Sequence, residues 1–315
     1  MIATENVWPR LAGLDVRATT DSLHLFSQVV GKIRLMMTPW INHSWHVPLY
    51  LSARGLTSGL ITTDSHALEV EFDFLTDRLV VRSSDGRDIQ VGLSAQSVAS
   101  FYAATIGALE TLGFAITIDP MPCELPECVA FPSDHAPRAY DGETARTYWL
   151  ALLQIQRVFQ IFRSRFIGKC SPIHLFWGSF DLAVTRFSGR PAPRHPGGVP
   201  HLSDAVVREA YSHEVSSAGF WPGGGTVTSP SFYSYAYPAP PGFSGADVEP
   251  REAYFDEALG EFLLAYDVVQ ASTDPDGTLL RFLQSTYEAA ATRARWDRTG
   301  LERPSGRFGE PPASP

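Results

Sequence analysis

A passage from helix to strand that occurs twice constrains this chain more than any other feature. The second copy, residues 162–190, runs from an aromatic helical stripe into a strand-like segment. The first copy, residues 26–55, is fainter, but Gly31-Lys32 corresponds to Gly168-Lys169 and each copy has a Trp nine residues before an Arg. Two copies of one helix-to-strand unit predict a duplicated fold in which both halves share the same plan.

The first half is predicted to be a helix, an antiparallel meander and a second helix. Apolar residues recur at steps of three and four between Leu23 and Met37, which is typical of a buried helix face, and Thr20 or Asp21 can cap its start. From Trp45 the period becomes two. Strands are expected at 45–51, 68–74, 79–82, 89–93 and 114–118, with a helix between Ser94 and Gly113.

The second half is predicted to repeat this order. Its helix runs from about residue 143 to 168, and a strand follows at 173–187. Segment 189–200 is rich in Gly and Pro, and we expect a long loop of the kind that is flexible or covers a site. Asp274 and Pro275 are suited to cap the final helix. Before that helix, strands are expected at 212–220, 232–237 and 260–268.

The predicted fold class is therefore α+β, with two related halves that each contain an antiparallel β-meander and flanking helices. The halves cover residues 1–118 and 143–298. Residues 119–142 are rich in Pro, Cys and acidic side chains without periodicity, so we expect a linker whose acidic groups are solvated. The chain becomes polar and Pro-rich near its end, which predicts a disordered tail at 299–315.

Composition limits the classes of function. The 315 residues are 44% hydrophobic, and the formal net charge of −9 disfavours nucleic acid as a partner. No apolar window approaches about 18 residues and no signal peptide is evident, so we expect a cytoplasmic protein without a membrane partner. Cys123, Cys128 and Cys170 fit no zinc pattern. A Cys123–Cys128 disulfide is possible, but a reduced state is the simpler interpretation.

Four motifs carry a resemblance to a known family. They lie at residues 42–50 (NHSWHVPLY), 171–190 (SPIHLFWGSFDLAVTRFSGR), 209–223 (EAYSHEVSSAGFWPG) and 282–291 (FLQSTYEAAA). Together they resemble an uncharacterised bacterial family, the domain of unknown function 5996, over nearly all of the chain up to about residue 298. The resemblance implies a bacterial cytosolic protein. It implies no activity, cofactor or catalytic residue.

Cations recur around both helix-to-strand passages, although the chain is acidic. Arg can bind a carboxylate or phosphate through two parallel hydrogen bonds and Lys adds a point charge, so the cations predict an anion site. The alternative is that they cap helix C-termini or pair with Asp and Glu. The predicted ligand contacts among them are Lys32, Arg54, Lys169, Arg186 and Arg190, and Arg165 belongs to the same set.

Aromatic residues are predicted to form the walls of this site. On a strand at 173–187, Trp177, Ser179, Asp181 and Thr185 would share one face and form a pocket wall. Trp45, at the equivalent place in the first half, and Tyr235 complete the predicted walls. The alternatives are an Asp181 that pairs with Arg186 or Arg190, and a tyrosine strand that is a half-buried sheet edge.

Acid–base and metal chemistry receive weaker support. Asp181 or Glu214 is a candidate base, with His174 or His213 as its proton partner. The histidines, His43 and His46 among them, have no metal-ligand spacing, so we predict no metal site. No nucleophile elbow, phosphate-binding loop or dinucleotide fingerprint is present, and the sequence identifies no cofactor.

Three functions remain open at this stage. The leading hypothesis is a protein that binds an acidic small molecule at the junction of its two halves. The second is an enzyme that uses the Asp or Glu and His candidates in the same cleft. The third is a structural protein whose aromatic patches bind a partner. The sequence does not determine the oligomeric state.

Overall fold

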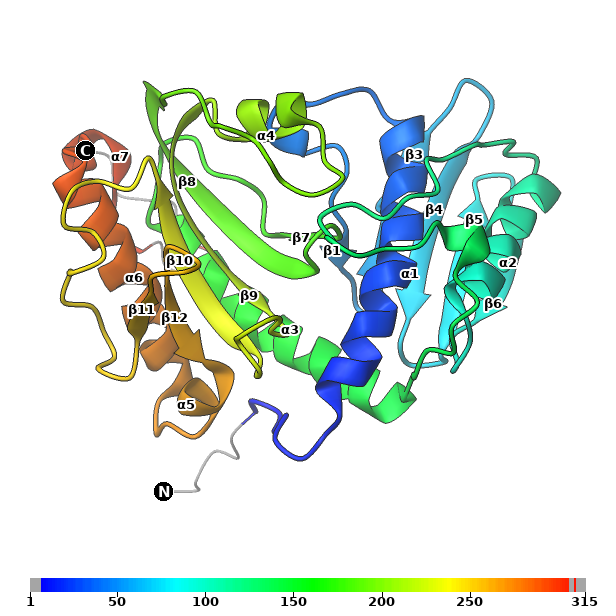
Figure 1. Ribbon diagram of the computed structural model, residues 1–315, viewed down its shortest axis with the longest axis horizontal. Coiled ribbons are helices and arrows are strands. Elements are labelled where there is room, and N and C mark those ends of the chain that lie inside the picture. The colour runs from blue at the N-terminus through cyan, green and yellow to red at the C-terminus, as the bar shows by residue number, and fades with distance from the viewer. Residues whose placement is uncertain (1–6, 306–308, 310–315) are drawn as a thin grey trace.

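The computed structural model describes residues 7–305 and residue 309. Two antiparallel six-stranded sheets lie side by side, each with helices packed against it, and the long helices α1 and α3 lie toward the middle (Figure 1). The predicted α+β class with two similar halves is confirmed. A duplication as the origin of the halves stays a prediction.

The N-terminal half begins with a helix and continues as a meander. Its sheet has the order β1-β2-β4-β5-β6, and β3 pairs with β4 beside β2. The elements are α1 (Val16–Met37), the 3-10 helix η1 (Asn42–Ser44), β1 (Tyr50–Leu51), β2 (Gly55–Thr57), β3 (Ile61–Thr62), β4 (Ala67–Asp73), β5 (Arg78–Ser83), β6 (Asp88–Gly92) and α2 (Val98–Thr111).

The C-terminal half follows a connection that contains the 3-10 helix η2 (Phe131–Ser133). Its sheet has the order β11-β12-β10-β9-β8-β7, and every pair is antiparallel. The elements are α3 (Gly142–Ser164), β7 (His174–Phe176), β8 (Asp181–Pro191), α4 (Asp204–Ala210), β9 (His213–Trp221), β10 (Ser231–Tyr237), β11 (Tyr254–Asp256), β12 (Glu261–Ala265), α5 (Tyr266–Gln270), α6 (Pro275–Arg293) and α7 (Arg298–Leu301).

Several predicted boundaries are wrong for local reasons. The side chain of Asp15 accepts a hydrogen bond from the N–H of Ala18, so α1 starts before Thr20, which lies inside the helix. Likewise Ser97 caps α2 in place of Ser94. The pair Asp274 and Pro275 does start α6, as predicted.

The two strands predicted after the first and third helices are interrupted. His43 and Ser44 have positive φ angles of 59° and 56°, so the chain turns there and β1 contains only Tyr50 and Leu51. The predicted strand 173–187 is a hairpin, because residues 177–180 turn between β7 and β8 and Phe180 has a φ of 57°. The alternation of side chains in the sequence is the same in a single strand and in two strands joined by a short turn, so it did not reveal the turn.

Other elements also differ from the predictions. Helix α3 ends at Ser164, so Gly168-Lys169 follows a helix whereas Gly31-Lys32 lies inside one, and the two pairs are not structurally equivalent. Segment 114–118 forms no strand, and α4, α5 and β11 were not predicted. The expected tail 299–315 begins inside α7 (Arg298–Leu301), and residues 306–308 and 310–315 lie outside the described residues.

The two halves meet at the edges of their sheets. The N–H of Leu49 donates to the carbonyl of Leu175 at 2.9 Å, and the reverse bond is 2.8 Å long. The indole N–H of Trp177 donates to the carbonyl of Val47 at 2.9 Å. The ring of Trp177 also packs on α1, where a Cβ at Gly31 would lie 2.1 Å from the indole nitrogen. The absence of a side chain at position 31 therefore lets the halves approach.

A buried side chain of α1, Gln28, holds the predicted linker at Cys123. Gln28 is fully buried, and its amide oxygen accepts from the N–H of Cys123 at 2.8 Å while its amide nitrogen donates to the carbonyl of Cys123 at 3.0 Å. This pair of bonds holds the segment around residue 123 beside the junction. In the described part of the chain, no helix has the length and apolarity needed to cross a membrane.

We predict that Gly31→Ala lowers the free energy of unfolding by about 1–3 kcal/mol, because the new methyl group overlaps the ring of Trp177. The matched control is Gly107→Ala in α2, where an added Cβ meets no atom within 4 Å. It should instead raise stability by about 0.5–1 kcal/mol, since Ala is the better helix former. Urea unfolding of both variants measures this, and equal effects would contradict the proposed contact.

Candidate functional site

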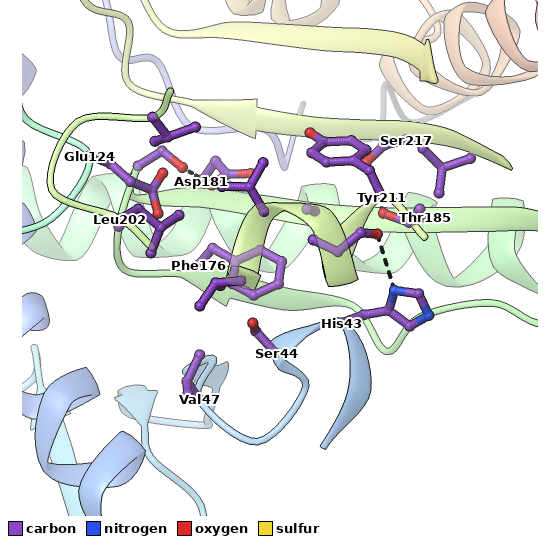
Figure 2. A pocket seen from close by; sticks show the side chains of 18 of the residues that line it. His43, Ser44, Val47, Glu124, Phe176, Asp181, Thr185, Leu202, Tyr211 and Ser217 are labelled. Atoms are coloured by element: carbon purple, nitrogen blue, oxygen red, sulfur yellow. Dashed lines mark hydrogen bonds between the residues drawn. The ribbon is translucent and has the colours of Figure 1, made fainter. Parts of the chain in front are cut away.

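One cavity of about 480 Å³ lies on the face of the β8–β9–β10 sheet that is opposite α3 and α6. Alternate residues of β8 point into it, because successive side chains of a strand face opposite sides of a sheet. Figure 2 shows it between this sheet, η1 and α4. Its lining includes Trp45, Val47, Glu124, Phe176, Trp177, Ser179, Asp181, Ala183, Thr185, Phe187, Leu202, Val206, Tyr211, Ser217, Trp221, Tyr233, Tyr235 and Glu261.

The walls are mainly aromatic and aliphatic. Trp45 and Trp177 come from the two sides of the junction, and Tyr233 and Tyr235 stack with 6.1 Å between ring centroids on β10. The three walls predicted from the sequence, Trp45, Trp177 and Tyr235, all line this cavity. The residues assigned to one face of the predicted strand 173–187 therefore do line the cavity, although this segment is a hairpin and not a single strand.

One end of the cavity is acidic. Asp181 is buried, and it accepts hydrogen bonds from the hydroxyl of Tyr233 and, at 2.9 Å, from the hydroxyl of Ser179. Glu124 lies beside it, as Figure 2 shows, and Glu261 at the start of β12 also lines the cavity. No arginine or lysine in the described chain forms an ion pair with any of these carboxyl groups.

Burial changes the protonation of these groups. Loss of water raises the pKa of Glu124 to about 7, and the charge of Asp181 acts in the same direction. Burial likewise raises the pKa of Glu261 to about 7, again with a contribution from Asp181. The pKa of Asp181 itself is raised by burial, against the two hydrogen bonds that favour its charged form. Glu124 and Glu261 thus keep their protons to a higher pH than ordinary carboxyl groups do, and the pKa of Asp181 is shifted in the same direction.

The other end of the cavity holds His43. Its Nδ1 donates to the carbonyl of Ala210 at 3.1 Å, so Nε2 carries the lone pair and lies 2.5 Å from the Nζ of Lys169. Thr185 and Ser217 share a hydrogen bond of 2.8 Å between their hydroxyl groups near this end. Figure 2 shows His43 at one end of the cavity and Glu124 with Asp181 at the other.

Residues 199–211, which include α4, cover the cavity. The hydroxyls of Tyr211 and Tyr235 are 3.0 Å apart, and the indole N–H of Trp40 donates to Glu209 at 2.5 Å. The N–H of Glu124 donates to the carbonyl of Pro200 at 2.8 Å. The covering segment is thereby attached to both halves and to the segment between them.

The sequence profile of one family, described as a family of unknown function (DUF5996), matches residues 8–303. The chain belongs to this family. The match spans both halves and every segment that lines the cavity, and it confirms the family resemblance carried by the four motifs. Neither a curated protein nor a solved structure matches the chain.

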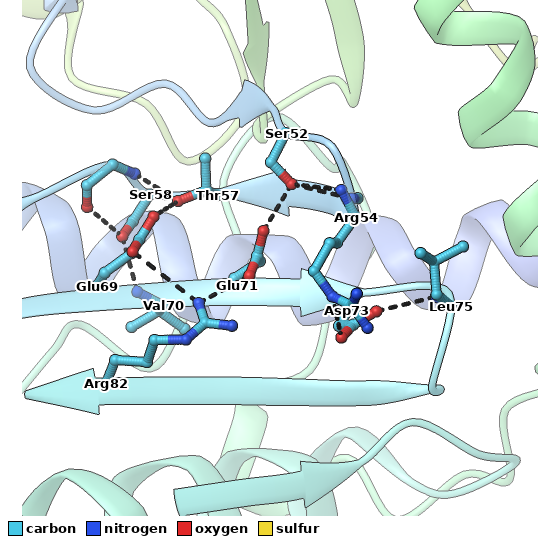
Figure 3. A network of polar contacts seen from close by, with 12 residues as sticks. Ser52, Arg54, Thr57, Ser58, Glu69, Val70, Glu71, Asp73, Leu75 and Arg82 are labelled. Atoms are coloured by element: carbon cyan, nitrogen blue, oxygen red, sulfur yellow. Dashed lines mark hydrogen bonds and ion pairs between the residues drawn. The ribbon is translucent and has the colours of Figure 1, made fainter. Parts of the chain in front are cut away.

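The predicted cations are not among the residues that line the cavity, and three of them pair with a carboxylate. Lys32 is buried and contacts Asp119 at 3.2 Å. Arg54 contacts Asp73 at 2.7 Å in the polar network on the N-terminal sheet that Figure 3 shows. Arg190 contacts Glu214 at 2.6 Å. The convergent anion site predicted from the sequence is not assembled, and these three side chains take the alternative role of ion-pair partners.

Arg186 is the most unusual of these cations. Its residue is 1% exposed, and its guanidinium carbon lies 3.5 Å from the ring centroid of Phe162 and 4.3 Å from that of Tyr287. One nitrogen donates to the carbonyl of Phe162, but Nε and Nη1 have no hydrogen-bond partner among the described residues. Burial lowers the pKa of Arg186 to about 10. It lies on the face of β8 that is opposite the cavity, so it cannot contact a ligand there.

The predicted proton partners of Asp181 are also elsewhere. His174 is buried without lining the cavity, and burial lowers its pKa to about 3, so it stays neutral. His213 has its ring 6.1 Å from that of His43 and does not line the cavity. Glu214 bonds to Arg190 and Ser188. Asp181 has hydroxyl partners instead, and neither Arg186 nor Arg190 pairs with it.

Two acidic residues of the cavity, Glu124 and Glu261, were not predicted from the sequence, each for its own reason. Glu124 lies in the predicted linker, whose acidic groups were expected in solvent, and no periodicity there indicates which side chain is covered. Glu261 is the first residue of β12, and no alternation of apolar and polar residues there indicates which side of the sheet its side chain faces. In the described part of the chain no group of three His, Cys, Asp or Glu side chains is arranged to hold a metal, and the three cysteines are free thiols.

The raised pKa values of Glu124 and Glu261 predict a pH dependence of stability. Their unfolded pKa is about 4.3, and the folded protein keeps their protons up to about pH 7. The folded state then binds more protons than the unfolded chain in this window, so the free energy of unfolding falls as pH rises through it. Glu124→Gln should make the fall shallower in denaturant titrations between pH 4.5 and 7.5, whereas Glu127→Gln, at an exposed position, should leave it unchanged.

We expect the free energy of unfolding of Arg186→Met to lie within about 1 kcal/mol of that of the unsubstituted protein, or above it. The reason is that a well-packed apolar side chain replaces a buried charge that lacks a carboxylate partner. Arg186→Ala leaves a cavity and should cost about 2–5 kcal/mol. Thermal unfolding of both variants tests this. A loss above about 3 kcal/mol in Arg186→Met would mean that the stacked cation stabilises the fold.

Proposed function

We propose that the protein binds a small, mostly apolar molecule in the cavity between its two halves. The observation that supports this most is the cavity itself, which has about 480 Å³ and places aromatic walls between two polar ends. Small-molecule sites have this volume and this combination of apolar walls with few polar groups. Residues 199–211 cover the space and would exclude water from a bound ligand.

The shape of the cavity favours an elongated ligand. Its lining follows β8 from Asp181 to Phe187, which is six steps of an extended strand, or roughly 20 Å. A ligand of that length would contact the carboxyl groups at one end and His43 at the other. Between the ends, the hydroxyls of Thr185 and Ser217 would supply hydrogen bonds and the aromatic rings would supply apolar contact.

The charges around the cavity favour a neutral or basic ligand. Asp181, Glu124 and Glu261 line it, and none of the Arg and Lys side chains that the structure describes pairs with them. An ammonium or hydroxyl group would therefore satisfy these carboxyl groups, whereas a carboxylate would be repelled. The acidic ligand expected from the sequence remains an untested prediction. Among the predicted cations, Lys169 is the one that contacts lining residues, at the opposite end.

An enzyme is the second candidate, on one specific observation. Glu124 has a pKa raised to about 7 and lies beside Asp181, whose hydrogen bonds favour its charged form. A carboxyl group with a pKa near the working pH is suited to general acid–base catalysis. This pair would replace the Asp181–histidine pair of the sequence analysis.

We also infer a cytoplasmic location, since Cys123, Cys128 and Cys170 are unpaired.

The test compares octan-1-ol, octylamine and octanoate as probes in thermal melts, because they share one chain and differ in the head group. We expect octan-1-ol and octylamine to raise the melting temperature more than octanoate. Binding to the folded state alone adds about 2.7 kcal/mol at a hundred times the dissociation constant, which a melt resolves.

A matched pair of variants locates the binding. Ala183→Leu fills the cavity from β8 and should abolish the shifts, while Ala103→Leu, exposed on α2, should leave them unchanged. Shifts that survive Ala183→Leu would place the probes elsewhere. No shift with any probe would contradict the proposal and direct attention to a protein partner.

A further inference from the structure

The chain has two lysines, Lys32 and Lys169, among 25 cationic side chains of Lys and Arg. Lys32 is buried and paired with Asp119. Lys169 is exposed, and within the described residues it forms no ion pair with a carboxylate. Arg keeps its proton in proteins, whereas the amine of Lys can lose it and react. The position of Lys169 is therefore informative in a chain that otherwise uses Arg.

The backbone around Lys169 is fixed to the wall of the cavity. The N–H of Phe187 donates to the carbonyl of Lys169 at 3.0 Å, and the backbone of Cys170 pairs with that of Arg186 in β8 as an isolated antiparallel β-bridge. The Nζ of Lys169 lies 4.8 Å from the ring centroid of Phe187 and 5.3 Å from that of Trp45. Both rings and His43 line the cavity, and the amine lies next to them at the same end, although Lys169 is not itself a lining residue.

The nearest polar partner of this amine is a base. His43 is buried, and its Nδ1 proton is engaged by the carbonyl of Ala210, which leaves the lone pair of Nε2 directed at Nζ at 2.5 Å. Burial lowers the pKa of His43, and the charge of Lys169 lowers it further, so the ring is neutral. Loss of water contact lowers the pKa of Lys169 as well. Among the described residues, no carboxylate pairs with Lys169 and holds it in the ammonium form.

We propose that Lys169 is a nucleophilic amine that condenses with the carbonyl group of an aldehyde or ketone, with His43 as the base that accepts its proton. The neutral nitrogen attacks the carbonyl carbon, a C–N bond forms and the C=O π pair moves to oxygen. The proton leaves nitrogen for Nε2 of His43 and passes to that oxygen, which gives a carbinolamine. Loss of water yields the imine, so amine and carbonyl become imine and water without an oxidant or reductant.

The cavity would select the carbonyl compound. Trp45 and Phe187 touch both the amine and the cavity, so an aldehyde with an apolar chain could place that chain between the aromatic walls while its carbonyl carbon meets Nζ. This preference for an apolar chain rests on the proposed function. The reactivity of Lys169 does not, because it depends on His43 and on the missing carboxylate alone.

The experiment traps the imine by reduction. The full chain is incubated with octanal or propanal and sodium cyanoborohydride, and peptide mass spectrometry measures alkylation at Lys169, at Lys32 and at the N-terminal amine. We expect Lys169 to be alkylated fastest, Lys169→Arg to lose that product and Lys32→Arg to keep it. His43→Gln should slow the reaction at Lys169 by about 100-fold or more, since a positioned base contributes that much.

The outcomes separate the two proposals. Alkylation of Lys169 no faster than that of the N-terminal amine, or unchanged in His43→Gln, would overturn the reactive amine even if octan-1-ol still shifts the melt. If Lys169 reacts fast with propanal and no faster with octanal, the reactive amine is supported and the apolar ligand site is not. If His43→Gln does not fold, the comparison of Lys169 with Lys32 and the N-terminal amine within the unsubstituted protein decides.

Discussion

The packing of Trp177 on Gly31 is the contact on which the arrangement of the two halves depends. The indole ring occupies the space that a side chain at position 31 would need, and its N–H bonds to the carbonyl of Val47. The reciprocal backbone bonds between Leu49 and Leu175 then join the sheets at their edges. Buried apolar residues of both halves belong to one cluster, so the halves share a continuous core.

The same turn that carries Trp177 also forms the acidic end of the cavity. Gly178 follows it, and a Cβ there would lie 1.9 Å from a carboxyl oxygen of Glu124, so any other residue at position 178 would displace that carboxyl group. Ser179 then bonds to Asp181. The junction between the halves and the chemistry of the site thus depend on residues 177–181 and on the segment around Glu124, which Gln28 holds in place.

The candidate site could be predicted only in part. Trp45, Trp177, Tyr235 and Asp181 were found because aromatic and polar residues alternate near a predicted strand, and alternation assigns a face. The predicted cations do not gather at one place, because spacing along the chain does not say which acid each one meets. Arg186 shows this most clearly, since it shares β8 with Thr185 and Phe187 but points into the opposite layer.

The sequence by itself determined the α+β class, the number of major helices before each sheet and most strand positions, because apolar periodicity is a local property that burial of one face imposes. Only the tertiary structure decided which residues meet. Glu124 reaches Asp181 from a segment without periodicity, and His43 reaches Lys169 across 126 positions of sequence. The raised pKa of Glu124 has the same origin, since it arises from burial by residues that are distant in the chain.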